Sequence, residues 1–180
     1  MFIRKLFCFA LMMLFLAIAS NSYAGGDVFK PGSEPDGFRG IKWGADIGTL
    51  HNMEFIGTDP DNPNTKVYER KGDIKELGAA KLNSISYAFW NGKFCIATVL
   101  TTREVDYDNL KNVCFEKFGK GVQNNQFMEN YIWFGDKARM SLKYNEISKI
   151  GNLTIFSTDI TNRIISQQDR KNNEGATNGF

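Results

Sequence analysis

The dipeptide Asn91-Gly92 separates two runs of residues that favour β-strands, and this is the strongest local signal in the chain. Asn-Gly is preferred in a two-residue type I′ turn, because both residues tolerate the positive φ that this turn requires. The sequence therefore predicts a β-hairpin over Lys81–Leu100. The register that such a turn sets places Trp90 opposite Lys93, Phe89 opposite Phe94, Ala88 opposite Cys95, and Tyr87 opposite Ile96.

The two faces of this hairpin differ in side-chain size, because neighbouring residues of a strand point to opposite faces. The large, aromatic face consists of Ile85, Tyr87, Phe89, Phe94 and Ile96. The small face consists of Ser84, Ser86, Ala88, Cys95, Ala97 and Val99. A helix that packs on the small face can approach the sheet closely.

Two segments combine a helix cap with apolar residues at helical spacing. Asp106 precedes the clearer one, Tyr107–Phe118, and Gly119 follows it as the expected stop. A shorter helix is expected after Asp46, ending at Gly57. The apolar faces consist of Leu110, Val113, Cys114 and Phe118 in the first helix, and of Ile47, Leu50 and Met53 in the second.

A second hairpin is expected over Phe127–Tyr144, turning at Gly135-Asp136, and a last strand over Asn152–Thr158. The alternation of apolar and polar residues in this second hairpin is typical of an antiparallel sheet with one buried face. The apolar face consists of Phe127, Tyr131, Trp133, Met140, Leu142 and Tyr144. The element order predicts an α+β fold in which two helices pack on an antiparallel sheet.

An internal repeat is one interpretation of this order. Met53–Gly57 resembles Phe115–Gly119, each at the expected end of a helix. A duplicated helix–hairpin unit would explain the match. Chance would explain it equally well, because a glycine commonly follows the end of a helix.

Residues 1–24 have the organisation of a secretory signal peptide. Basic residues precede an apolar run from Leu6 to Ala19, and Ser22-Tyr23-Ala24 supplies small residues at the positions that a signal peptidase recognises. The run is shorter than the roughly 20 residues of a membrane-spanning helix. We therefore expect a periplasmic or secreted protein, cleaved before Gly25 and without a membrane span afterwards.

The remaining chain divides into an irregular lead-in at 25–40, a single α+β domain at 41–166 and a polar tail at 167–180. The formal net charge of +2 is removed with Arg4 and Lys5 of the signal. A neutral mature chain lacks the positive field that favours nucleic acids, so we expect no nucleic-acid partner. With one histidine and three cysteines in the chain, we expect no metal ion or other cofactor.

The signal peptide, the two capped helices and the hairpins at Asn91-Gly92 and Gly135-Asp136 resemble small exported α+β modules. Such modules are typified by BamE-like outer-membrane assembly lipoproteins and by the β-lactamase-inhibitor-protein type. Phe38–Gly44 also resembles the opening of small exported bacterial proteins. The resemblance covers about residues 38–160 and implies helix–hairpin units on an antiparallel sheet, with a role in protein binding. Cys8 lies inside the apolar run, so we expect no lipid anchor.

Cys95 and Cys114 are the cysteines left after removal of the signal, and they are the candidate disulfide. An oxidising compartment favours a bridge, which would stabilise the fold by roughly 3 kcal/mol. If the helix that contains Cys114 packs on the small face, Cys95 lies beneath it. The alternative is two separate buried thiols, with Cys95 on the face away from the helix.

The candidate binding residues are aromatic or lie beside an aromatic residue: Trp90, Lys93, Tyr87 and Trp133. Tyr and Trp dominate the energetics of protein interfaces, so an exposed aromatic sheet face could bind a partner. The same side chains can instead form the core, where large apolar residues usually lie. Trp90, beside the first turn, is the aromatic residue that we most expect at the surface.

The sequence contains no recognisable nucleophile–base pair, metal cluster or phosphate-binding loop. His51 lacks a partner motif and is expected on a helix surface. Asp59–Asn64 departs from the pattern of an EF-hand and is expected to form a proline-braced turn. We therefore expect an exported, non-catalytic binding or scaffold module whose partner is another envelope protein.

Two other functions remain open. A carboxylate-based hydrolase or lyase would use Asp106, Asp108 and Glu116 as candidate acids. Two of these acids in one cleft, one of them with a raised pKa, would favour that function. A carrier of a small apolar ligand would instead show a closed pocket between the sheet and the helices.

Overall fold

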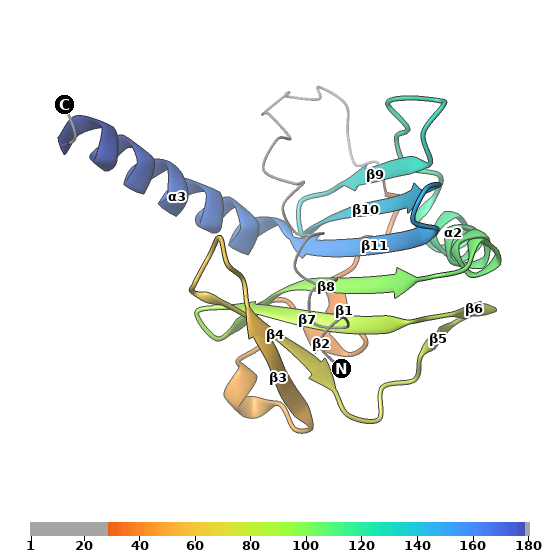
Figure 1. Ribbon diagram of the computed structural model, residues 1–180, viewed down its shortest axis with the longest axis horizontal. Coiled ribbons are helices and arrows are strands. Elements are labelled where there is room, and N and C mark those ends of the chain that lie inside the picture. Colours follow the sequence, from red (N-terminus) through yellow and green to blue (C-terminus); the bar gives the residue numbers. More distant parts are fainter. Residues whose placement is uncertain (1–28, 179–180) are drawn as a thin grey trace.

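The computed structural model describes residues 29–178, so the expected signal peptide lies outside the described residues. A seven-stranded antiparallel sheet forms the centre of the molecule, with two helices and two small two-stranded sheets beside it (Figure 1). The predicted α+β fold is confirmed. Within 29–178, no helix has both the length and the apolar character needed to cross a membrane.

The large sheet is built from strands that are all paired in antiparallel fashion. They are β3 (Met53–Thr58), β4 (Thr65–Arg70), β7 (Ser84–Trp90), β8 (Lys93–Thr101), β9 (Asn130–Phe134), β10 (Ala138–Asn145) and β11 (Ile150–Ser157). Their order in the sheet is β3-β4-β7-β8-β11-β10-β9. The small sheets consist of β1 (Gly37–Phe38) with β2 (Ile41–Lys42), and of β5 (Glu76–Leu77) with β6 (Ala80–Lys81). The helices are α2 (Glu104–Phe118) and α3 (Thr158–Asn178).

One face of the large sheet carries the main hydrophobic core, which α2 and the segment before β3 cover. Leu110, Cys114 and Phe118 of α2 pack into this core, as their helical spacing predicted. From the segment before β3, Trp43 stacks on Phe94 with ring centroids 4.9 Å apart. The expected aromatic sheet face is therefore covered by α2 and by the segment before β3, and it is not open to a partner.

The end of α2 agrees with the prediction, and its beginning does not. Gly119 has a φ of +82°, which glycine adopts without strain, and its carbonyl accepts the indole N–H of Trp133 at 2.9 Å. The helix begins at Glu104, so Asp106 lies in its first turn and is not its cap. The Asp106 carboxylate instead accepts the backbone N–H of Lys81 in β6, at 3.0 Å.

The shorter helix expected after Asp46 is wrong. Asp46 does cap a turn there, but only a 3-10 helix at Ile47–Thr49 forms. Asn52 then takes a positive φ of 64°, and Met53–Thr58 is strand β3. Because this segment is a strand and Phe115–Gly119 is a helix end, the sequence match between them does not correspond to a repeated local structure. Within the described residues, the α-helices are α2 and α3.

The first hairpin forms at Asn91-Gly92, where both residues have the positive φ of a type I′ turn. Trp90 lies opposite Lys93 and Phe89 opposite Phe94, as predicted. A β-bulge then shifts the register, so that Ala88 lies opposite Ile96 and Tyr87 opposite Ala97. The expected faces are therefore wrong for Ile96, Ala97 and Val99. The bulge places Ala97 and Val99 in the main core and Ile96 on the opposite face, whereas Cys95 stays with Ala88 on that opposite face, as predicted.

The second hairpin is formed by β9 and β10, and its predicted apolar residues Tyr131, Trp133, Met140 and Leu142 are buried. Phe127 is an exception, because β9 begins only at Asn130 and the Phe127 side chain is 87% exposed. Glu34 holds the turn between the strands, since its carboxylate accepts the backbone N–H groups of Lys137 and Ala138.

The C-terminal segment, expected to be a polar tail from residue 167 on, is helical as far as the structure describes it. Residues 158–178 form the continuous helix α3, which extends away from the sheet (Figure 1). Its first turns are anchored to the sheet through Ile160 and Ile164. These contacts hold the start of α3 against the sheet, and the polar residues that follow continue the same helix.

Candidate functional site

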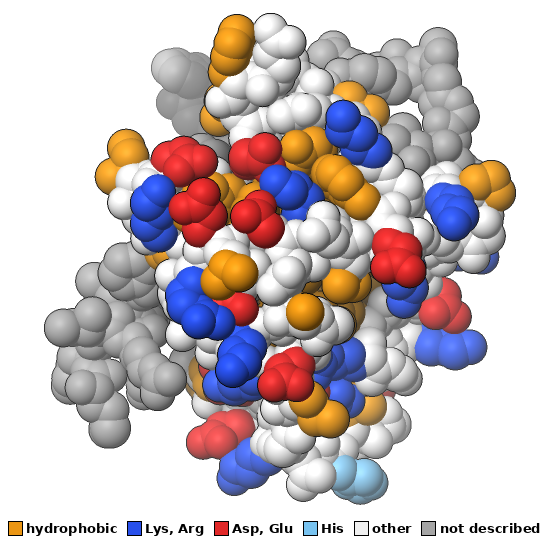
Figure 2. Space-filling model, turned by 90° about the vertical axis from the view of Figure 1, so that its right-hand side faces the viewer, with side chains coloured by type: hydrophobic (Ala, Val, Ile, Leu, Met, Phe, Trp, Pro, Cys, Tyr) orange, Lys and Arg blue, Asp and Glu red, His pale blue; other side chains and the backbone are white. Residues whose placement is uncertain are grey.

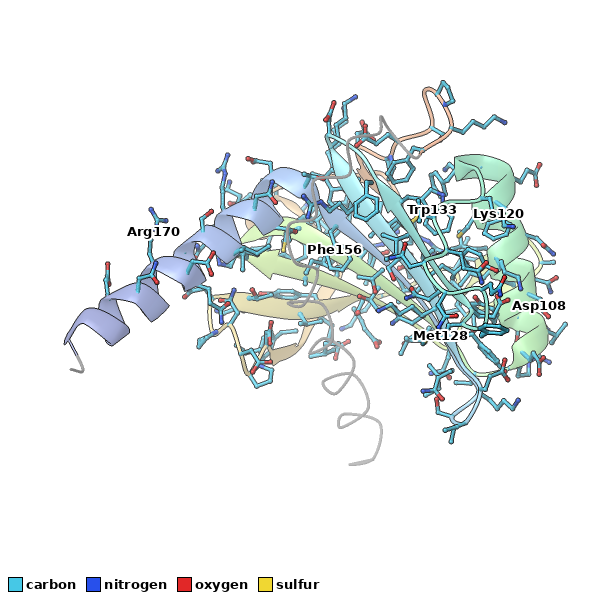
Figure 3. All side chains as sticks on the ribbon, turned by 90° about the horizontal axis from the view of Figure 1, so that it is seen from above. Asp108, Lys120, Met128, Trp133, Phe156 and Arg170 are labelled. Atoms are coloured by element: carbon cyan, nitrogen blue, oxygen red, sulfur yellow. The ribbon has the colours of Figure 1, made fainter. Side chains whose placement is uncertain are left out.

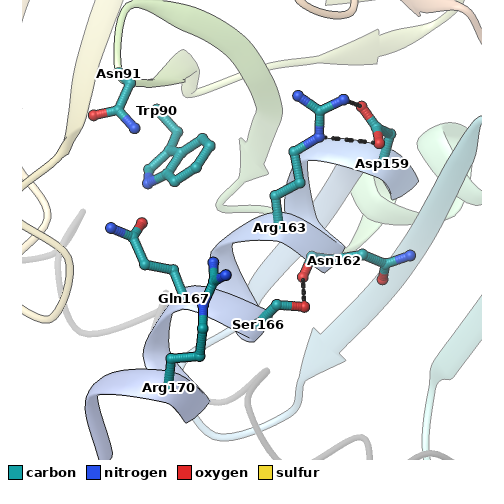
Figure 4. Close-up of a pocket in the computed structure, with 8 residues that line it drawn as sticks. All are labelled: Trp90, Asn91, Asp159, Asn162, Arg163, Ser166, Gln167 and Arg170. Atoms are coloured by element: carbon teal, nitrogen blue, oxygen red, sulfur yellow. Dashed lines mark hydrogen bonds and ion pairs between the residues drawn. The ribbon is translucent and has the colours of Figure 1, made fainter. Parts of the chain in front are cut away.

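A groove of about 460 Å³ lies between the first hairpin turn and α3 (Figure 4). We call it the Trp90 groove. Its lining consists of Trp90, Asn91, Asp159, Asn162, Arg163, Ser166, Gln167 and Arg170. All of the lining residues except Trp90 have polar or charged side chains, unlike those of a pocket for a small apolar ligand.

The two walls of the groove come from segments far apart in the sequence. The type I′ turn places Trp90 and Asn91 on one wall, and the Asn91 N–H donates to the carbonyl of Asn64 at 2.9 Å. The other wall is α3, whose start is fixed by Thr158. The Thr158 N–H donates to Lys137 at 3.0 Å, and its hydroxyl to the carbonyl of Gly135 at 3.1 Å.

A second hydrophobic cluster forms the floor beneath these walls. Ala88, Cys95 and Ile160 are buried in it, on the sheet face opposite the main core. Trp90 is half-buried and packs against this cluster, as does Ile164 of α3. Trp90 therefore contributes to the core of this face and to the wall of the groove at once.

The indole N–H of Trp90 is buried and has no hydrogen-bond partner in the described part of the chain. Leaving a buried donor unpaired costs about 1–3 kcal/mol, so an unpaired donor in a native structure needs an explanation. In Figure 4, the Gln167 side chain lies next to the indole, on the side of its nitrogen.

The charges of the groove lie on α3. Arg163 forms an ion pair with Asp159 one turn earlier, with 2.8 Å between Nη2 and Oδ2. Ser166 donates its hydroxyl to the carbonyl of Asn162 at 2.8 Å. Arg170 has no ion pair within residues 29–178. Two arginines and one aspartate leave the lining with one net positive charge.

Lys93, the residue paired with Trp90 in the hairpin, does not line the groove. Its ammonium group contacts the Asp46 carboxylate at 3.1 Å. The backbone N–H of Gly48 and this ammonium group lower the pKa of Asp46. Lys93 therefore joins the hairpin to the 3-10 helix.

Tyr87 and Trp133, the other two candidate binding residues, are completely buried and belong to the core. Figure 3 shows Trp133 between the sheet and α2. The Tyr87 hydroxyl donates to the Asp73 carboxylate, and burial raises the pKa of Tyr87 far above its ordinary value.

Asp73 is the centre of a buried charge network that the sequence analysis did not identify. Arg39 contacts its carboxylate at 3.0 Å and Arg70 at 2.8 Å, and the Asp73 side chain is 6% exposed. Burial acts to raise the pKa of Asp73, but the hydrogen bonds from Tyr87 and the two arginines hold it below its ordinary value. The network attaches the loop after β4 to the core.

Cys95 and Cys114 do not form the expected disulfide. Cys114 lies in the main core with α2, whereas Cys95 lies with Ala88 in the cluster on the opposite face, which is the alternative of two separate buried thiols. The Cys95 thiol donates to the carbonyl of Ala88 at 3.3 Å. Burial raises the pKa of each thiol to about 12, so neither is a reactive nucleophile.

The three candidate acids on α2 do not converge in one cleft. Arg103 binds the buried Asp106 carboxylate and lowers its pKa. Asp108 is exposed and pairs with Lys111 at 3.2 Å, and Glu116 is exposed. This arrangement differs from the acid pair that we named as the mark of a hydrolase or lyase.

A polar cluster around Glu129 was also not identified from the sequence. Its carboxylate contacts Lys111 at 2.9 Å, and accepts the hydroxyls of Tyr107 at 3.1 Å and Tyr131 at 3.3 Å. Burial acts to raise the pKa of Glu129, but the bond to Lys111 lowers it. The cluster ties the loop before β9 to α2. Figure 2 shows charges of both signs close together, with hydrophobic side chains between them, at this end of the molecule.

The segment Asp59–Asn64 forms a turn in which side chains bind the backbone. Asp59 accepts the N–H of Asp61 at 3.1 Å, and Asn62 accepts that of Asn64 at 3.3 Å. Burial raises the pKa of Asp59. His51 is exposed and lies just after the 3-10 helix. Over the residues that the structure describes, no three His, Cys, Asp or Glu side chains are grouped as metal ligands would be.

Comparisons with protein families, with curated proteins and with solved structures give no match to this chain. The resemblance to BamE-like and β-lactamase-inhibitor-protein-like modules therefore stays a prediction. The function has to be argued from the residues of the chain itself.

Proposed function

We propose that the protein is an exported, non-catalytic binding module, and that it contacts another envelope protein through the Trp90 groove. The unpaired, buried indole N–H of Trp90 is the observation that carries this proposal. A bound partner that offers a carbonyl or carboxylate oxygen removes the cost of this unpaired donor. The Gln167 side chain, which lies beside the indole nitrogen, would have to rotate to admit that oxygen (Figure 4).

The burial of the other candidate aromatic residues also favours the Trp90 groove as the binding site. Tyr87 and Trp133 are inside the core, so they are not available to a partner. Trp90 is half-buried, rigidly held by the hairpin turn, and adjacent to amide and guanidinium groups. Trp and Arg side chains in partly enclosed sites are the residues that contribute most to binding in protein interfaces.

Site-specific photo-crosslinking in cells tests the contact site. A benzophenone side chain replaces exposed Ser166 in the groove, or, as a control, Ile74, which is 71% exposed in the loop after β4. We expect a discrete adduct with another protein at position 166, none at 74, and a weaker adduct when Trp90→Phe is combined with the probe at 166. No adduct at 166, or the same adduct at both positions, contradicts the proposal.

Export is tested separately by the N-terminus of the protein recovered from cells. We expect it to begin at Gly25, because Ser22-Tyr23-Ala24 satisfies the requirements of signal peptidase. Mass spectrometry of the intact protein distinguishes this product from the full chain. A protein that retains residues 1–24 contradicts export by this route.

A further inference from the structure

The lining of the Trp90 groove is elongated along α3. Asn162, Ser166 and Arg170 follow one another at intervals of four residues, so they lie along one side of the helix. The distance along the axis from the first to the last is about 12 Å, at 1.5 Å per residue. An extended peptide covers this distance with about four residues, at roughly 3.3 Å each.

The charges on this side of the helix favour an anionic group near Arg170. Arg163 is already paired with Asp159. Arg170, two turns further along, has no such pair among the described residues, and it extends from α3 beside the groove (Figure 4). The planar guanidinium group offers two parallel N–H donors, which match the two oxygens of a carboxylate.

The remaining lining residues match a peptide backbone. The side-chain amides of Asn91 and Gln167 lie on the two walls of the groove. Each amide supplies both a donor and an acceptor, as does each peptide unit of an extended segment. The unpaired N–H of Trp90 adds a donor for a peptide carbonyl. A small free anion would use Arg170 but not these groups.

From this arrangement we propose that the Trp90 groove binds an extended peptide segment that carries a carboxylate side chain. This inference rests on the proposed function, because it names the chemistry of the partner at the same site. The carboxylate pairs with Arg170, the backbone of the peptide pairs with Asn91 and Gln167, and one of its carbonyl oxygens accepts the Trp90 N–H.

Fluorescence anisotropy with defined peptides tests this inference. The probe is a labelled peptide of about eight residues in which Glu and Ser alternate, and the matched peptide has Gln in place of every Glu. We expect the Glu peptide to bind about tenfold more tightly, since charge-assisted hydrogen bonds are about twice as strong as neutral ones. We also expect added salt to weaken its binding.

The variant Arg170→Gln is expected to abolish the preference for the Glu peptide. Lys71→Gln is the matched control, because Lys71 is 70% exposed and lies beyond the end of β4 that is remote from Trp90. NMR locates the contact, because the indole N–H resonance of Trp90, assigned through Trp90→Phe, is expected to shift when the Glu peptide binds.

Several results would overturn the inference. These are equal binding of the Glu and Gln peptides, a preference that survives Arg170→Gln, or binding without a shift of the Trp90 resonance. Tighter binding of inorganic phosphate, or of vesicles that contain phosphatidylglycerol, would assign the groove to another anion. If the crosslinked partner is found but the Glu peptide does not bind, the inference fails while the proposed function stands. If neither is found, both fail.

Discussion

Cys95 and Cys114 lie on opposite faces of the seven-stranded sheet, each in its own hydrophobic cluster. The sheet between them prevents the close approach of the two Cβ atoms that a disulfide requires. The separation arises because α2 packs on the aromatic face of the first hairpin, whereas Cys95, the neighbour of Phe94 in β8, points to the opposite face. The stability of this fold therefore does not depend on the redox state of its compartment.

Both thiols are expected to stay reduced in the protein recovered from an oxidising compartment. Alkylation in denaturant without reductant, followed by peptide mapping, should find both Cys95 and Cys114 modified. Without denaturant, modification should be slow, because burial raises both pKa values to about 12 and few thiolates form. A peptide pair linked through these two residues would contradict the prediction.

Asp73→Asn is expected to destabilise the protein by about 2 kcal/mol, because it leaves two partly buried guanidinium groups without their charge partner. Urea unfolding measures the change. Arg39 and Arg70 remain in place, so the loss should exceed that of Tyr87→Phe, which removes only one hydroxyl from the network. An equal or smaller loss in Asp73→Asn would contradict this account.

The pH dependence of stability isolates the same carboxylate. The folded-state pKa of Asp73 is lowered, so its contribution is present above the unfolded pKa of about 3.9 and is lost as the pH falls through the folded value. Between about pH 5 and pH 3, the wild type should therefore lose more stability than Asp73→Asn. Parallel curves for the two proteins would show that Asp73 does not titrate in this way.

Trp90→Phe and Trp133→Phe form a matched pair of substitutions. The Trp133 N–H has a buried acceptor, the carbonyl of Gly119, and the side chain is completely buried. Its replacement leaves that carbonyl unpaired and opens a cavity, so we expect a loss of about 3 kcal/mol. Trp90→Phe removes an unpaired donor, so its effect on the free energy of unfolding should stay below about 1 kcal/mol.

Thermal or urea unfolding of the two variants measures this difference. A loss in Trp90→Phe as large as that in Trp133→Phe would show that the Trp90 N–H already has a partner in the free protein. In that case the Trp90 N–H would not need a bound acceptor in the groove.

Features set by neighbouring residues could be predicted from the sequence. Asn91-Gly92 specified its turn, because few other dipeptides tolerate positive φ at both positions. Gly119 specified the end of α2 for a similar reason. The alternation in β9 and β10 predicted the buried side chains of both strands.

Features set by tertiary contacts could not be predicted. The apolar spacing of Ile47, Leu50 and Met53 suits a helix, but pairing with β4 makes Met53 part of a strand. The bulge at Cys95 has no local signal, and it exchanged the faces of Ile96 and Ala97. The bulge adds Ile96 to the floor of the Trp90 groove, and the wall opposite Trp90 is the helix α3, whose residues from 167 on were expected to form a polar tail.

The attachment of α3 is expected to depend on Ile160, which is 7% exposed and packs beside Cys95 in the cluster under the groove. Ile160→Ala should cost about 3 kcal/mol, as truncation of a buried isoleucine usually does. Because α3 makes few other contacts with the sheet, part of this loss should appear as local opening of the helix. Such opening exposes Cys95 on one face of the sheet while Cys114 stays covered by α2 on the other.

The rates of thiol modification under native conditions distinguish local from global opening. In Ile160→Ala, the rate at Cys95 should rise by at least about tenfold more than the rate at Cys114, because only the cluster under α3 opens. Ile165→Ala is the control on the same helix, since Ile165 is 37% exposed, and it should change stability by less than about 0.5 kcal/mol. Equal increases at the two cysteines would mean that the substitution only promotes global unfolding, and that α3 is not an independently opening wall of the groove.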